Sequence, residues 1–168
     1  MMNSQKSICP GCELAMPRQE SAVYDGYFNT SPECWGVFTE VLASEFSNAV
    51  LFGQVHQLTV DTYAVQHAGG NHPDKSVDVH LTGLHLALIQ GVSSPGVAPL
   101  LQRIASRVKS WPKLAPPQRF VDITVCDVAL AESMEDHVHK VREWSLAVWN
   151  AWSEHHAAVA RLVSLNLD

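Results

Sequence analysis

Three of the four cysteines lie near the N-terminus with the spacing of metal ligands. Cys9 and Cys12 form a C-x-x-C pair around a Pro-Gly turn, a spacing that lets two thiolates reach one ion and that is typical of zinc knuckles. Cys34 follows inside the segment SPECW and is a natural third ligand. The alternative is that the cysteines are unrelated, with Cys34 simply a small residue buried under a helix. We expect a metal site, and zinc is the ion that such thiolates favour.

A fourth ligand has to come from another part of the chain, because no second C-x-x-C pair is present. The candidates are His56, His67, His80 and the adjacent pair His155 and His156. Among these we expect His67 and His80 to bind metal. A redox role for the C-x-x-C pair is disfavoured, because redox pairs normally open a helix after a strand and an irregular segment follows here instead.

Further polar side chains lie on a helix predicted in the middle of the sequence. His56 and His67 share one face of this helix but are about 16 Å apart along its axis, so they cannot bind the same ion directly. Each could pair instead with a group from another helix, such as Glu45 or His80, and Asp61 could orient a neighbouring histidine. The alternative is a buried hydrogen-bond network that fixes helix register. His56, Asp61 and Glu45 are the candidate catalytic residues.

Helix start and stop signals divide the rest of the chain into about five helices. Ser31 and Pro32 have the residue types of an N-cap and a first helical position, and Gly69 and Gly70 form a stop signal. Thr124 opens an acidic variant of a capping box, and the helix that it begins is predicted to be the longest. The predicted helices cover residues 31–47, 50–67, 76–90, 99–109 and 124–151, with an extension of the last toward 165 as an alternative.

The sequence therefore predicts an all-α fold, a helical bundle with an irregular cysteine-containing N-terminal segment. Proline and glycine interrupt any regular pattern in residues 1–30, which we interpret as a metal-knuckle lead. Residues 31–168 make up the bundle, within one domain overall. A strand pattern is confined to the short segment 120–124. The tryptophans Trp144, Trp149 and Trp152 are expected in the core or in an interface rather than in a cofactor site.

Composition limits the classes of partner and the location of the protein. The 168 residues carry a formal net charge of -6 and no basic stripe, which argues against nucleic acid as a partner. No apolar run approaches the roughly 20 residues of a membrane span, and the first residues lack the apolar stretch of a signal peptide. We therefore expect a soluble, cytoplasmic protein with no membrane partner. Charged residues make up only 17%, which makes a homo-oligomer a candidate state.

Longer motifs resemble a bacterial family of domains of unknown function, whose members start with CPGC and carry SPECW and HQLTVDxYAVQH. This chain has CPGC at 9–12, SPECW at 31–35 and HQLTVDTYAVQH at 56–67. Further similarity lies at 79–81, at 124–128 and in the tryptophan-rich end. The resemblance covers nearly the whole chain and implies family membership without implying an activity. Ala68 departs from the pattern, in which proline often follows the last histidine, and this affects the helix stop more than the chemistry.

Two hypotheses for the function follow. In the first, zinc held by the N-terminal cysteines and a histidine is structural, in a protein whose role is binding or regulation; this predicts four protein ligands and loss of the fold on chelation. In the second, the chain is a metal-dependent enzyme, hydrolase-like or thiol-transfer-like, acting on a small molecule that the sequence does not specify. It predicts three protein ligands plus water beside a pocket lined by His56, Asp61 or Glu45. A metal-free helical dimer is a third interpretation. For the cysteine site, the number of thiolates favours the first hypothesis.

Overall fold

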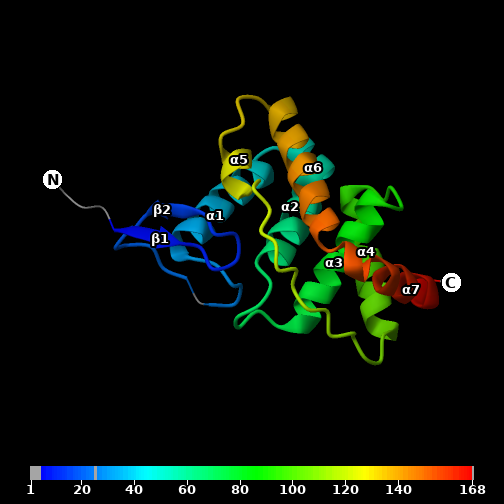
Figure 1. The fold of residues 1–168 in the computed structure, drawn as a ribbon. Coiled ribbons are helices and arrows are strands. Elements are labelled where there is room, and N and C mark those ends of the chain that lie inside the picture. Colours follow the sequence, from blue (N-terminus) through cyan, green and yellow to red (C-terminus); the bar gives the residue numbers. More distant parts are fainter. Residues whose placement is uncertain (1–4, 25, 168) are drawn as a thin grey trace.

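A computed structural model describes residues 5–24 and 26–167, and this part of the chain forms a short hairpin and seven α-helices (Figure 1). The all-α fold predicted from the sequence is confirmed. The elements are β1 (Lys6–Ile8), β2 (Ala15–Pro17), α1 (Pro32–Phe46), α2 (Ala49–Gln66), α3 (Asp74–Leu88), α4 (Ser94–Arg107), α5 (Val125–Ala129), α6 (Met134–Ala151), the 3-10 turn η1 (Ser153–His155) and α7 (His156–Leu167).

The N-terminal lead is more regular than its proline and glycine content predicts. Its strands pair antiparallel, with Ser7 opposite Met16, and the C-x-x-C turn forms the tip of the hairpin. Two backbone bonds close this tip, from the Cys9 N–H to the Leu14 carbonyl at 2.9 Å and from the Glu13 N–H to the Cys9 carbonyl at 2.8 Å. Each strand has only three residues, too few to display the alternating pattern by which a strand is recognised in a sequence.

The N-terminal ends of α1 and α2 follow from capping side chains. The Ser31 hydroxyl accepts the Cys34 N–H at 3.2 Å and fixes Cys34 in the first turn of α1. The Asn48 side chain accepts the N–H groups of Val50 and Leu51 and starts α2 immediately after α1 ends. Helix α2 is consequently antiparallel to its neighbour, and its C-terminal end returns toward the start of α1 and the hairpin.

The long last helix that the sequence predicts from Thr124 is interrupted. The capping box between Thr124 and Asp127 is present, with the Thr124 N–H bonded to the Asp127 carboxylate at 2.7 Å, but the helix that it opens, α5, has five residues. Ser133 then starts α6, accepting the Asp136 N–H at 3.1 Å. Ser133 is therefore a second N-cap inside the predicted helix, and it is the sequence signal for the break between α5 and α6. The segment predicted as a strand, 120–124, forms no strand.

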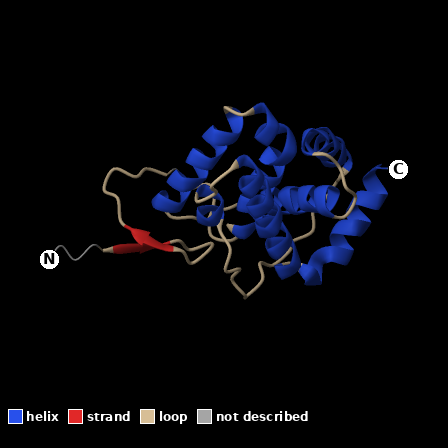
Figure 2. Ribbon diagram, turned by 90° about the horizontal axis from the view of Figure 1, so that it is seen from above, coloured by secondary structure: helices blue, strands red, loops and turns tan. Residues whose placement is uncertain are grey.

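Helix α2 lies at the centre of the bundle and packs against α1, α3, α4 and α6. The indole rings of Trp144, Trp149 and Trp152 are buried, as the sequence predicts. Figures 1 and 2 place the hairpin beside α1 at one end of the molecule, with α7 and the C-terminus at the other. The cysteines of the hairpin tip nevertheless belong to the same apolar core as the helices. Within the described residues, no helix combines the length and the apolar character that crossing a bilayer requires.

Candidate metal centre

Cys9, Cys12, Cys34 and His67 converge on one buried point. Their three sulfurs and one ring nitrogen all lie within 4.8 Å of one another, and no member of the group is more than 5% exposed. The first two cysteines come from the hairpin tip, Cys34 from the first turn of α1 and His67 from the C-cap of α2. All of these cysteines are free thiols. The cluster could therefore hold a metal ion between three elements that are distant in sequence.

Two distances within the cluster match the edges of a zinc coordination tetrahedron. Bonds of about 2.3 Å to sulfur and 2.0–2.1 Å to nitrogen give tetrahedral edges of about 3.8 Å between two sulfurs and about 3.5 Å between sulfur and nitrogen. The Cys12 and Cys34 sulfurs are 3.8 Å apart, and the Cys34 sulfur is 3.5 Å from His67 Nε2. A disulfide would require about 2.05 Å, so these sulfurs are not bonded to each other, and their spacing is one that ligands of a common ion could have.

His67 is held in the orientation that a metal ligand needs. Its Nδ1 lies 2.7 Å from the Tyr63 carbonyl, one helical turn earlier. A carbonyl only accepts, so Nδ1 carries a proton, and in the neutral ring Nε2 is the nitrogen whose lone pair faces the cysteines. The Tyr63 ring stacks on the imidazole with centroids 3.9 Å apart and fixes the ring plane. Both constraints come from the end of α2, so the protein alone fixes the orientation of the His67 ring.

The C-terminal end of α2 docks onto the lead through Asn29 and Gly11. The Asn29 N–H donates to the His67 carbonyl at 3.1 Å, and its side-chain amide donates to the Ala68 carbonyl at 3.1 Å. These bonds satisfy carbonyls that a helix end leaves without partners. Gly11 lies so close to this junction that an added Cβ would stand 2.4 Å from the Asn29 oxygen and 2.6 Å from the His67 ring. The glycine in the C-x-x-C turn is therefore a packing requirement as well as a turn residue.

Hydroxyl groups surround the sulfurs. Thr30 Oγ1 lies 3.4 Å from the Cys9 sulfur and 2.7 Å from the Tyr63 hydroxyl, which in turn donates to the Cys34 sulfur at 3.6 Å. Donors at these positions stabilise thiolates and orient them toward a metal. Tyr63 also stacks on Phe38 with centroids 3.8 Å apart, so its position is fixed by the core.

Without a cation the cluster contains more acidic groups than can ionise together. Hydrogen bonds from the thiols of Cys12 and Cys34 lower the pKa of Cys9, whereas contact with the sulfurs of Cys34 and Cys9 raises the pKa of Cys12. Burial opposes protonation of His67, yet the sulfurs of Cys34 and Cys9 raise its pKa to about 9. A positive charge at this point would favour the ionised form of the thiols, which is the form that binds a metal ion.

His80, predicted as a further ligand, lies outside this cluster. Its Nδ1 is 2.7 Å from the carboxylate of Asp61, which is fully buried and also accepts the Gln57 side-chain amide at 2.9 Å. Burial raises the pKa of Asp61, and the hydrogen bond from His80 opposes that rise. The structure thus forms the pairing of Asp61 with a histidine from another helix that the sequence suggests as an alternative to metal binding.

Glu45 and His56 form a second polar centre, together with His137, which is not among the candidates named from the sequence. The fully buried Glu45 carboxylate lies 2.9 Å from His56 Nδ1 and 2.9 Å from His137 Nε2, and it accepts the Thr59 hydroxyl at 2.6 Å. His137 is 92 positions from Glu45 in sequence, within a charged stretch of α6 that resembles an exposed helix face. No local signal indicated its role. These side chains bond to one another and not to the four-residue cluster.

Neither a curated protein nor a solved structure matches the chain. One family model, described as a family of unknown function, matches residues 7–153. The match runs from within β1 to the first residue of η1 and contains Cys9, Cys12, Cys34 and His67. It confirms the resemblance to an uncharacterised family that the motifs indicated. The chain therefore belongs to the family of unknown function DUF5946.

Proposed function

We propose that the protein binds one Zn²⁺ ion through Cys9, Cys12, Cys34 and His67, and that this ion is structural. The agreement between the 3.8 Å and 3.5 Å distances in the cluster and the edges of a zinc tetrahedron is the observation that carries the proposal. Three thiolates and one imidazole are a donor set common in structural zinc sites. The three negative charges of the thiolates exceed the two positive charges of the ion by one.

The burial of the cluster supports a closed site. Four protein ligands fill a tetrahedral coordination sphere, whereas catalytic zinc keeps one position for water or substrate. The Cys9 and Cys34 sulfurs and the His67 ring belong to residues with no exposed surface. A metal-dependent hydrolase or thiol transferase would need an open position at the ion, and the histidines paired with Glu45 and Asp61 are engaged elsewhere.

The ion would attach the hairpin to the helices. Two strands of three residues cannot form a stable unit alone, because isolated hairpins are marginal even when they are longer. Coordination joins the hairpin tip to the start of α1 and the end of α2, and metal binding at such a junction contributes directly to folding. The function that we propose is therefore that of a zinc-stabilised helical protein whose N-terminal lead is fixed by the metal.

Metal analysis of the purified full chain tests this proposal. We expect one zinc per chain by elemental mass spectrometry, with zinc lost from Cys9→Ser/Cys12→Ser and from His67→Ala. Cys126→Ser and His80→Ala are matched controls, because they remove the same residue types outside the cluster, and both should retain zinc.

Two results would contradict it. Wild-type protein purified without chelators and free of metal would exclude the site. Loss of zinc from His80→Ala with retention in His67→Ala would show that the fourth ligand is His80 on α3 and not His67. The closed geometry has its own test, because the visible spectrum of a cobalt-substituted site with four protein ligands should not change when cyanide or azide is added.

A further inference from the structure

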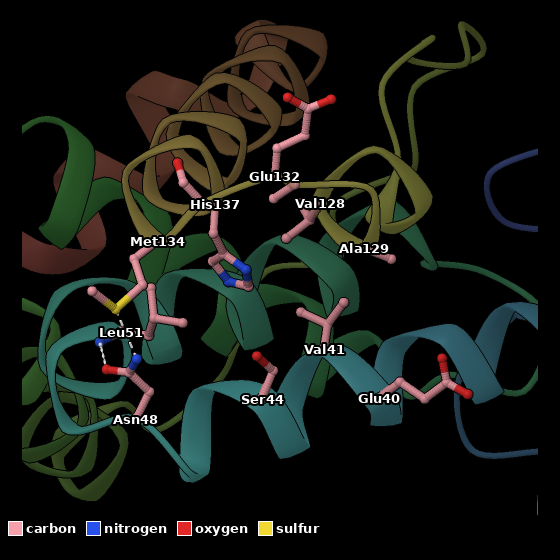
Figure 3. A pocket seen from close by; sticks show the side chains of 12 residues that line it. Glu40, Val41, Ser44, Asn48, Leu51, Val128, Ala129, Glu132, Met134 and His137 are labelled. Carbon is pink, nitrogen blue, oxygen red and sulfur yellow. Dashed lines mark hydrogen bonds between the residues drawn. The ribbon is translucent and has the colours of Figure 1, made fainter.

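A cavity of about 300 Å³ lies between α1, the start of α2 and the α5–α6 connection, apart from the metal centre (Figure 3). Its walls combine apolar side chains, among them Val41 and Leu51, with the hydroxyl of Ser44 and the imidazole of His137. Figure 3 shows the His137 ring directed into the space that these three other side chains frame. The volume is at the lower end of the range for small-molecule sites.

His137 presents an unused acceptor to this cavity. Its Nε2 is 2.9 Å from Glu45 Oε1, within a carboxylate that also receives His56 and Thr59. An ionised carboxylate only accepts, so in the neutral His137 ring Nε2 carries the proton and Nδ1 keeps its lone pair. The His137 residue is 7% exposed. Its Nδ1 atom forms no hydrogen bond with a described residue and is partly accessible to solvent. A ligand in the cavity would therefore meet a hydrogen-bond acceptor held in a fixed orientation.

The charged side chains around the cavity determine which kind of hydrogen-bond donor a ligand should carry. Glu40 and Glu132 lie at its rim, and neither forms an ion pair with a described lysine, arginine or histidine. The described residues that line the cavity include no lysine or arginine. A rim with two carboxylates and no cation attracts a positive ligand and repels an anion.

We propose that this cavity binds a small aliphatic amine in its ammonium form. The ammonium group donates to His137 Nδ1 under the influence of the two rim carboxylates, and the short alkyl portion packs against Val41 and Leu51. Glu45 is a positioning residue, because it fixes the tautomer of His137 and does not line the cavity. The site is independent of the zinc ion.

Titration of the zinc-loaded full chain with n-butylammonium chloride tests the proposal, with the histidine ring signals followed by NMR. The neutral n-butanol and the anion butyrate are matched controls of similar length. We expect the ring signals of His137, identified by their loss in His137→Gln, to shift with n-butylammonium and not with either control. His137→Gln keeps a donor for Glu45 but replaces the rigid ring acceptor Nδ1 by an amide oxygen on a flexible side chain, and it should weaken binding about tenfold.

The rim supplies a second variant that leaves the buried centre intact. Glu40→Gln/Glu132→Gln should raise the dissociation constant by a factor of about two to five for each charge removed, whereas Glu143→Gln, an exposed position outside the cavity, should leave it unchanged. No shift of the His137 signals with n-butylammonium, equal binding of n-butanol, or unchanged affinity in both the His137 and the rim variants would each overturn the proposal.

Discussion

Replacing Gly11 by alanine is the sharpest test of how the hairpin tip meets the end of α2. The added Cβ would lie 2.4 Å from the Asn29 carbonyl oxygen, 2.6 Å from His67 Cδ2 and 2.9 Å from His67 Cα. Two of these atoms belong to the backbone, and a hydrogen bond of 3.1 Å from Asn29 to His67 ties the two residues together. No flexible side chain is available to yield, so either the metal ligand or the C-x-x-C turn has to move.

The expected magnitude follows from the cost of overpacking. Forcing one extra methyl group into a packed site costs about 1–3 kcal/mol. Three contacts below 3.0 Å place Gly11→Ala at the upper part of that range. Since the displaced groups are a ligand and the turn that carries two others, we expect most of the cost to fall on metal affinity. A loss of about 1.4–2.8 kcal/mol corresponds to a tenfold to hundredfold weaker zinc affinity.

Competition with a chromophoric chelator measures this affinity in wild type and variant. Gly53→Ala is the matched control, because an added Cβ there meets nothing within 4 Å and Gly53 lies inside α2. Alanine is the better helix former by about 1 kcal/mol, so Gly53→Ala should raise the free energy of unfolding while leaving zinc affinity unchanged. Wild-type zinc affinity in Gly11→Ala, with the fold preserved by circular dichroism, would refute the packing argument and the junction between hairpin and α2.

Three further predictions concern other buried groups. Glu45→Gln should lower the free energy of unfolding by about 2–4 kcal/mol in urea denaturation, because an amide replaces a carboxylate that receives three donors, whereas the exposed Glu40→Gln should change little. Burial and the charge of Asp74 raise the pKa of Asp78 to about 7, above its value in the unfolded chain. The native state therefore binds this proton more tightly than the unfolded state does. The free energy of unfolding consequently falls as the pH rises toward and through 7. Between pH 6 and pH 8 the free energy of unfolding of wild type should fall by about 1.4 kcal/mol relative to that of Asp78→Asn. The same pH dependence of unfolding in both proteins would contradict this. Tyr63→Phe removes the hydroxyl bonded to the Cys34 sulfur and should weaken zinc affinity about tenfold in the chelator assay while one zinc per chain still binds.

Residue type and local spacing predict much of the metal centre. The C-x-x-C pair and the Ser-Pro helix start place Cys9, Cys12 and Cys34 in a turn and in a first helical turn, which are local structures with local signals. Selecting His67 as their companion depends on tertiary structure, because its distance to Cys34 is set by the docking of Asn29 onto the end of α2. His80 has the same residue type and a similar setting in the sequence, and only the fold directs it to Asp61 instead.

The other differences between the sequence prediction and the structure arise partly from tertiary contacts and partly from weak local signals. Glu45 and His56 are eleven positions apart, and the sequence suggests their pairing because both lie on adjacent predicted helices. His137 joins them from 92 positions away, a contact that no periodicity encodes. The hairpin was overlooked because strands of three residues show too little alternation, and the break between α5 and α6 because a strong capping box at Thr124 obscured the second N-cap at Ser133.

A structural metal in a chain that already has an apolar core implies that the ion and the core stabilise different parts of the fold. Helix α2 packs among α1, α3, α4 and α6 around buried side chains such as Trp144, none of which requires an ion. The proposed ligands link points 22 and 33 residues apart, and a cross-link restricts the unfolded chain more as the enclosed loop lengthens. Chelation is therefore expected to release the hairpin and loosen the start of α1, while the helices around α2 persist, a narrower effect than the loss of the whole fold inferred from the sequence. The role of the ion would then be to hold the lead, and with it the Gly11 junction, against the helices whose apolar core the lead's cysteines share.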